Sequence, residues 1–376
     1  MQKPVIWSGA VTDPSGYGEA SRNYVQALEK QNRFSIKVKP YYFWQGESVD
    51  LGDRLDLFIR LARTAIDMDR PHVDIRHLTP DVWNLTSSRA AINVGVTTFE
   101  TDRLPDHWRQ KMRSMDELWT FSHWAKDIFD EDGIRRPIHV VPHGVDIDMF
   151  CPDGEKLFDM GRDTFVFGSC FDWTERKNPT ALIKAYYSAF GVDSPVALVL
   201  RAYYQGRENS LIYIKKYIER IRQEMGLVHT PPIVLISGML SVDHMPALYR
   251  SFDAYVSASC GEGWGLGLSE AMAVGLPVIG VGWSGNTEFM NDENSLLLKN
   301  YTMKEITPAM AGHQSQYIGH HWADCDTEEL SHAMFAIFSD SQLRSALSNA
   351  ARESMKKFTW DCAAKVMADR IENLLS

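Results

Sequence analysis

The part of the sequence that most limits the possible fold is a strand–turn–helix pattern over residues 254–274. The run AYVSAS at 254–259 predicts a buried strand, a glycine-rich turn follows, and an alanine-rich stretch to Val274 predicts a helix. At such a corner the first N–H groups of the helix lack intrahelical partners, and the helix dipole favours an anion. Glu262 and Glu270 flank the turn, which suits a ligand with a phosphate at one end and hydroxyls at both.

Strands and helices alternate along the chain, which predicts an α/β fold with parallel sheets covered on both faces. Expected strands lie at 5–7, 34–42, 91–97, 117–120, 138–141, 165–168, 196–200, 233–237, 254–257 and 278–280. Expected helices lie at 18–28, 51–68, 180–190, 210–225 and, as two or three helices, within 330–375. Proline and glycine in the stretch 143–163 indicate a linker, so the 376 residues are expected to form two domains.

Composition excludes several classes of protein. The net charge of −10, with no basic block to offset it, argues against a nucleic-acid binder. The five cysteines are odd in number and lack metal-type spacing, so we interpret them as reduced thiols of a cytoplasmic protein. The chain begins with an apolar strand rather than a signal peptide, and no apolar run approaches the roughly 20 residues that span a bilayer.

A second glycine-containing loop, at 13–21, follows the first expected strand and opens a helix. Gly16 and Gly18 would let the backbone approach a phosphate closely. A dinucleotide-binding fingerprint is the alternative, but the G-x-G-x-x-G pattern is incomplete and no acidic residue clearly ends a second strand. A plain tight turn also remains open.

Two adjacent cations, Arg176 and Lys177, follow the first expected strand of the second domain and precede a helix. Fixed cations stabilise a leaving group that gains negative charge in the transition state. The alternative is a solvated basic pair, which the dipole at a helix start would slightly disfavour. An anionic ligand bound to the two cations would offset this unfavourable interaction with the dipole, so the pair favours an anionic partner.

The run at 261–280, continued by GWSGNTE at 282–288, resembles the donor-binding signature of retaining GT-B glycosyltransferases, in particular glycosyltransferase family 4. The Glu-x7-Glu pair of that family corresponds to Glu262 and Glu270. The resemblance implies two Rossmann-like domains facing across a cleft, with the C-terminal helix crossing back. It implies an acceptor domain at 1–155 with 359–376, and a nucleotide-sugar donor domain at 156–358.

The same resemblance implies roles for individual residues. Glu262 would contact hydroxyls of the donor sugar, and Glu270 those of the ribose. Other donor-binding positions are the diphosphate-facing glycines Gly16 and Gly18, the phosphate-binding Arg176 and Lys177, the base-reading backbone of Gly238 and Met239, and the amides of Trp264, Gly265 and Leu266. The family usually separates its two cations by several positions, so the lysine is the closer match.

Glu100, after the expected strand 91–97, stands where many relatives carry a histidine near the reacting sugar. The resemblance implies a catalytic role in which its carboxylate orients the acceptor or stabilises an oxocarbenium ion. The alternative is an acidic residue at a helix start.

The sequence thus predicts a retaining, metal-independent and cofactor-free hexosyltransferase of polysaccharide biosynthesis. Its donor would be GDP-mannose or a UDP-sugar, and its acceptor a hydroxyl of a glycan, a lipid-linked saccharide or a small molecule. The expected location is the cytoplasm, with peripheral contact at the inner face of a membrane allowed. The rivals are an NAD(P)-dependent oxidoreductase and a non-catalytic nucleotide-sugar binder.

Overall fold

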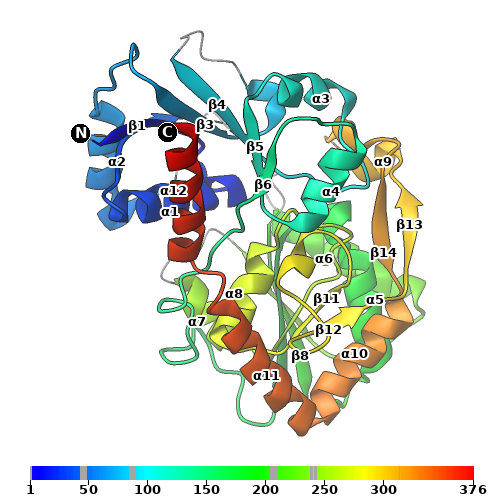
Figure 1. Ribbon diagram of the computed structural model, residues 1–376. Coiled ribbons are helices and arrows are strands. Elements are labelled where there is room, and N and C mark those ends of the chain that lie inside the picture. Colours follow the sequence, from blue (N-terminus) through cyan, green and yellow to red (C-terminus); the bar gives the residue numbers. More distant parts are fainter. Residues whose placement is uncertain are drawn as a thin grey trace. The chain divides into compact units, whose positions relative to one another are not determined.

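The computed structural model describes residues 2–42, 49–83, 90–203, 210–237, 240, 244–312 and 314–376, which form two compact units (Figure 1). Unit 1 comprises Met1–Phe99, Arg103–Gly144 and Phe358–Ser376. Unit 2 comprises Glu100–Asp102 and Val145–Lys357. The chain therefore leaves unit 1 at Gly144 and returns to it for its last helix.

A parallel sheet forms the centre of unit 1. Its strand order in the described part of the chain is β2-β1-β3-β4-β5-β6. The strands are β1 (Lys3–Gly9), β2 (Phe34–Pro40), β3 (His72–His77), β4 (Ala91–Val96), β5 (Glu117–Thr120) and β6 (Ile138–Val140). Because all pairings are parallel, the loops that follow the strands gather at one edge of the sheet, where α/β folds bind ligands.

The helices of unit 1 begin with α1 (Gly16–Lys30), whose N-cap Ser15 accepts a hydrogen bond from the Gly18 amide. The last helix, α12 (Trp360–Leu374), packs along α1 and buries Met367 and Ile371 (Figure 1). The remaining short helices are η1 (Gly52–Arg54), α2 (Leu55–Arg63), η2 (Pro80–Val82), α3 (Asp106–Arg113) and α4 (His123–Glu131).

Unit 2 contains a second parallel sheet, with strand order β12-β11-β10-β7-β8-β9 among the described residues. Its strands are β7 (Phe165–Asp172), β8 (Val196–Tyr203), β9 (Ile233–Ile236), β10 (Ala254–Val256), β11 (Val278–Val281) and β12 (Leu296–Leu298). Its helices are η3 (Glu175–Lys177), α5 (Pro179–Ala189), α6 (Ser210–Glu224), α7 (His244–Arg250), α8 (Leu266–Val274), η4 (Gly285–Glu288), α10 (Thr327–Ser339) and α11 (Ser341–Met355).

The central strands of this second sheet, β7, β8, β10 and β11, are buried on both faces. Phe167 of β7 belongs to the apolar core that α5 and α10 cover. The next residue, Gly168, faces the other way, and a Cβ there would meet the ring of Phe252, which follows α7. Burial on both faces explains why these strands are continuous apolar runs in the sequence rather than alternating ones.

A small antiparallel hairpin is attached to unit 2. Its strands, β13 (Tyr301–Glu305) and β14 (His321–Cys325), pair from Tyr301 opposite Cys325 to Glu305 opposite His321. The connection between them contains α9 (Pro308–Ala311) and η5 (Ser315–Tyr317).

Three parts of the strand architecture were not expected from the sequence, and one of them is the edge strand β12 of the second sheet. The central strand β3 was missed because its sequence, HVDIRH, lacks an apolar pattern, although all six residues are buried. The β13–β14 hairpin was missed because most residues of β13 are exposed. The ten expected strands are otherwise all present, with ends that differ by a few residues.

We expect Arg352→Met to destabilise unit 2. The guanidinium of Arg352 on α11 donates to the carbonyls of Phe150 and Ala273 at 2.8 and 2.5 Å, and to that of Ile147 at 2.8 Å. Losing three charge-assisted donors, with water replacing them in part, should cost about 2–4 kcal/mol. Urea unfolding measures this loss. Lys356→Met, at the exposed end of the same helix, is the control and should change stability by less than about 0.5 kcal/mol. Equal stability of the two variants would contradict the prediction.

No helix in the described part of the chain is long and apolar enough to cross a membrane. The five cysteines are unpaired thiols. Burial raises the pKa of Cys170 and of Cys325 to about 12, so these two thiols stay protonated at neutral pH.

Candidate functional site

Three loops of unit 2 meet at the carboxyl edge of its sheet. They follow β7, β10 and β11, which are neighbours in the sheet and run parallel. The loop after β7 carries Arg176 and Lys177, and the loop after β10 carries Glu262. The sheet topology therefore brings together side chains that lie 85 residues apart in the sequence.

The turn that holds Glu262 is fixed from the third loop. The Glu262 amide donates to the Ser284 hydroxyl at 2.8 Å, and the Gly285 amide donates to the Glu262 carbonyl at 2.8 Å. Ser284 in turn donates to the side chain of Asn286, which donates to the carbonyl of Val281 on β11. A Cβ at Gly285 would lie 2.2 Å from the Gly263 carbonyl oxygen, so only glycine fits this position.

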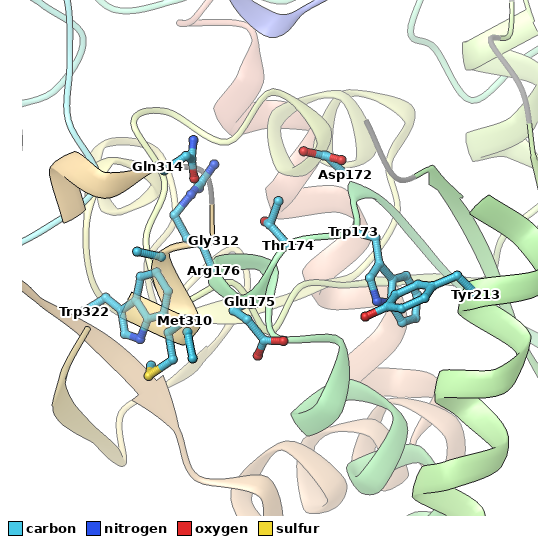
Figure 2. A pocket seen from close by; sticks show the side chains of 12 residues that line it. Asp172, Trp173, Thr174, Glu175, Arg176, Tyr213, Met310, Gly312, Gln314 and Trp322 are labelled. Carbon is cyan, nitrogen blue, oxygen red and sulfur yellow. The ribbon is translucent and has the colours of Figure 1, made fainter. Parts of the chain in front are cut away.

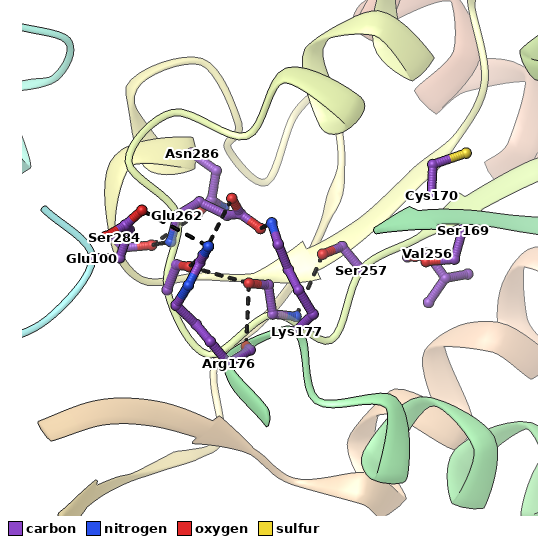
Figure 3. Close-up of polar contacts among 12 residues, drawn as sticks. Glu100, Ser169, Cys170, Arg176, Lys177, Val256, Ser257, Glu262, Ser284 and Asn286 are labelled. Carbon is purple, nitrogen blue, oxygen red and sulfur yellow. Dashed lines mark hydrogen bonds and ion pairs between the residues drawn. The ribbon is translucent and has the colours of Figure 1, made fainter. Parts of the chain in front are cut away.

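Two cations surround the Glu262 carboxylate (Figure 3). Lys177 Nζ lies 2.5 Å from Glu262 Oε1, and Arg176 Nη1 lies 3.7 Å from Glu262 Oε2. Arg176 also donates to the Gly261 carbonyl at 2.5 Å. All three side chains are at least four-fifths buried, with exposures of 14% for Arg176, 20% for Lys177 and 11% for Glu262.

The charges of this cluster shift one another's protonation. Burial acts to raise the pKa of Glu262, but Lys177 and Arg176 outweigh it and hold that pKa below its usual value. Burial lowers the pKa of Lys177, and Glu262 opposes this only in part. Glu262 is therefore ionised at neutral pH, and Lys177 loses its proton more easily than an exposed lysine. Perturbed groups of this kind are typical of functional sites.

Glu100 belongs to the same cluster, although it lies on a short segment between two stretches of unit 1. Its Oε1 lies 3.8 Å from Arg176 Nη2, and its Oε2 accepts a hydrogen bond from the Tyr317 hydroxyl at 2.7 Å. Burial acts to lower the pKa of Arg176, but Glu100 and the neighbouring acidic groups raise it. Arg176 thus bridges the two carboxylates that the sequence identified as catalytic candidates.

The β13–β14 hairpin holds the segment that carries Glu100. Thr101 Oγ1 lies 2.8 Å from His320 Nδ1, and the amide of His321 donates to Asp102 Oδ1 at 2.7 Å. Adjacent histidines thus contact consecutive residues of the segment. Tyr317, His320 and His321 were not identified as site residues from the sequence, because nothing local marks contacts across some 220 residues.

Glu270 lies on α8, where its Oε2 accepts a hydrogen bond from the Tyr249 hydroxyl at 2.7 Å. Tyr249 is fully buried, and burial together with the nearby Glu270 charge raises its pKa well above the usual value. The tyrosine therefore remains a donor and fixes one carboxylate oxygen. Sequence reasoning found Glu270 but missed Tyr249.

The remaining donor-site candidates of unit 2 surround the start of α8. Gly265, at φ 97°, is the N-cap, and Leu266 is the first helical residue. The Trp264 ring is buried against Phe289, and its indole donates to Ser269. Gly238 and Met239 lie outside the described residues.

Gly16 and Gly18 lie in unit 1 and are not part of this cluster. Both stand in the first turn of α1, at the carboxyl edge of the first sheet. A Cβ at Gly18 would lie 2.0 Å from the Asp13 carbonyl oxygen, so this glycine allows a tight loop. Tyr17 between them bonds to Thr97 Oγ1 at 2.9 Å. Among the described residues of either unit, no group of three or more His, Cys, Asp or Glu side chains is placed to hold a metal ion.

Part of the chain is similar in sequence to known proteins. Residues 166–312 match the model of the family described as glycosyl transferases group 1. The chain is 26% identical over 245 residues to the D-inositol 3-phosphate glycosyltransferase of Xylanimonas cellulosilytica, covering 62% of this chain and 50% of that protein. The chain thus spans about half the length of this curated relative.

Two solved structures are similar over almost the whole chain. Anabaena HepE, solved with UDP and glucose, has a TM-score of 0.65 at 14% identity, with 99% of this chain and 100% of that chain covered. The sucrose-phosphate synthase of Thermosynechococcus elongatus has a TM-score of 0.70 at 15% identity, with 99% of both chains covered. At these identities the structures establish the fold.

Proposed function

Because residues 166–312 match the glycosyl transferases group 1 and the chain has the GT-B fold, we propose that it transfers a hexose from a UDP-sugar to a hydroxyl of a glycan or related acceptor. The observation that carries the proposal is the buried cluster of Lys177, Arg176 and Glu262 beside the amino end of α8. It supplies cations for a diphosphate and a carboxylate for sugar hydroxyls at one sheet edge. We prefer uridine because the similar HepE was solved with UDP and glucose.

The proposed reaction uses these groups in order. When the bond between sugar C1 and the phosphate oxygen breaks, Lys177 and Arg176 stabilise the charge that develops on the departing diphosphate. Glu262 holds sugar hydroxyls, and Glu270, fixed by Tyr249, accepts hydrogen bonds from the ribose. The acceptor oxygen bonds to C1 on the face the phosphate leaves, and its proton passes to a phosphate oxygen. Configuration is then retained without a metal or an enzyme nucleophile.

A role for Glu100 follows from its position beside Arg176. Glu100 lies 3.8 Å from Nη2 of the guanidinium, whereas Glu262 lies 3.7 Å from Nη1. We propose that Glu100 orients Arg176 and the acceptor hydroxyl, rather than acting as a helix-start acid. The helix that follows, α3, begins only at Asp106, so Glu100 is not in its first turn.

The proposal is tested by titrating the protein with UDP, and with GDP and NAD as comparisons. UDP at about 100 times its dissociation constant should raise stability by about 2.7 kcal/mol, visible as a thermal shift. Lys177→Met should weaken UDP binding by about tenfold or more, because a hydrogen bond to a charged group is lost. Lys184→Met is the control. Lys184 is partly exposed on α5, and its ion pair with Glu224 is long, at 4.0 Å. A response to NAD with none to UDP would refute the proposal.

A further inference from the structure

A cavity of about 160 Å³ lies in unit 2 between the loop after β7 and the β13–β14 hairpin (Figure 2). The loop contributes residues 172–176 to its lining, and the hairpin region contributes residues 309–312, 314 and 322. Helix α6 contributes Tyr213. In the view of Figure 2, Trp322 and Met310 lie at one end, and Trp173 and Tyr213 at the other. The volume is below the roughly 300 Å³ of drug-sized ligand sites, so it suits a single ring.

Two residues that line this cavity each carry a buried hydrogen-bond donor that has no partner among the described residues. The donors are the indole N–H of Trp322, a side chain that is 2% exposed, and the Nε–H of Arg176. Leaving a buried donor unpaired is unfavourable, so such groups call for a ligand or a water as partner. Two of them on one cavity indicate an occupant rich in oxygen acceptors.

The other lining groups indicate the rest of the occupant's chemistry. The carboxylates of Asp172 and Glu175 accept hydrogen bonds from hydroxyls. The aromatic rings of Trp322 and Tyr213 offer faces for C–H groups. A pyranose ring has ring and hydroxyl oxygens, hydroxyl donors and a C–H face, and therefore uses all three kinds of group.

Arg176 connects this cavity with the candidate catalytic cluster. The same guanidinium that lines the cavity lies 3.8 Å from Glu100 and 3.7 Å from Glu262. An occupant that accepts from Arg176 would thus lie one side chain away from both carboxylates. Lys177 and Glu262, to which we assign the donor, do not line the cavity. The cavity is therefore separate from the proposed donor-sugar site.

We propose that this cavity is a subsite for one sugar ring of the acceptor, held by Trp322, Arg176 and Glu175 beside the reacting centre. The inference rests on the proposed function, since it names the acceptor as a saccharide. It makes the β13–β14 hairpin a part of acceptor recognition as well as the support of Glu100.

The test uses the full chain with and without saturating UDP. Methyl glycosides of glucose, galactose, mannose and N-acetylglucosamine serve as probes in saturation-transfer NMR. We expect at least one probe to bind in both conditions. Ala309→Trp, which fills the cavity from α9, should abolish that transfer, whereas Ile318→Trp, exposed and outside the lining, should leave it unchanged. Trp322→Phe should weaken binding about fivefold, the equivalent of one hydrogen bond of about 1 kcal/mol.

The UDP affinity of each variant separates the two proposals. If UDP binds and Ala309→Trp binds the glycosides as the native chain does, the subsite is wrong and the proposed function stands. If glycosides bind in the cavity but UDP does not bind, the proposed function fails and the sugar site stands. If no glycoside binds the native chain in either condition, the cavity holds only water and the inference is wrong.

Discussion

Glu262→Gln is expected to lower kcat/KM by about 10²- to 10³-fold and to destabilise unit 2. Hydrogen bonds to sugar hydroxyls that strengthen in the transition state contribute several kcal/mol, and the glutamine cannot provide the charge. The change also leaves Lys177 without its ion-pair partner and Arg176 with Glu100 at 3.8 Å, while both cations stay mostly buried. Breaking a buried pair in this way costs about 3–5 kcal/mol. Steady-state kinetics and urea unfolding measure the two effects separately.

A double variant separates the loss of stability, which comes from the unpaired buried cation, from the loss of turnover. Adding Lys177→Met to Glu262→Gln removes the unpaired cation, so it should recover much of the stability while turnover stays low. Glu293→Gln, at an exposed position, is the control for a neutral loss of charge. Native turnover in Glu262→Gln would contradict the assignment of Glu262 to the site.

Gly285→Ala is expected to damage the site without touching any of its charged groups. A methyl group there would lie 2.2 Å from the Gly263 carbonyl oxygen and 2.7 Å from that of Glu262, so the turn must move. Overpacking of this kind costs about 1–3 kcal/mol, and a displacement of about 1 Å at a reacting centre costs about 10²-fold in rate. Thermal unfolding and kinetics of the purified variant measure both.

Gly191→Ala is the matched control, because a methyl group at Gly191 would meet nothing within 4 Å. It should leave the rate unchanged and alter stability by less than about 1 kcal/mol. If Gly285→Ala retained the native rate, the third loop would not be what positions Glu262.

The sequence predicted well what depends on local patterns. Apolar runs such as 196–200 and 278–280 predicted the buried strands of unit 2. A strand that is buried on both faces is apolar at every position, so it appears in the sequence as a continuous apolar run. The resemblance drawn from the run at 261–288 is confirmed by the family match over residues 166–312 and by the GT-B fold. The assigned roles of Glu262, Glu270 and Lys177 stay predictions.

What the sequence could not predict depends on partners far along the chain. Arg76 of β3 is buried because it reaches Asp74 and, across the sheet, the Asn93 side chain at 3.1 Å. A run of polar residues gives no sign that such partners exist, and β3 was missed for that reason. The bond between Tyr317 and Glu100 has the same cause, since each residue looks ordinary in its own segment. The sequence named the members of the cluster as candidates, but it did not identify the side chains that contact them.

Two parts of unit 1, its sheet and the helix α12, are synthesised at different times. The sheet is complete once Val140 has been synthesised, but α12 follows only after residues 145–357. Ribosomes add roughly 5–20 residues per second, so the nascent unit waits on the order of ten to forty seconds for its last helix. During that time Tyr24 of α1 lacks the Trp360 ring, whose centroid is 5.1 Å away in the finished protein, and the face of α1 that α12 contacts stays exposed to solvent. Chaperones that shield apolar surface would therefore have most to protect in residues 1–144.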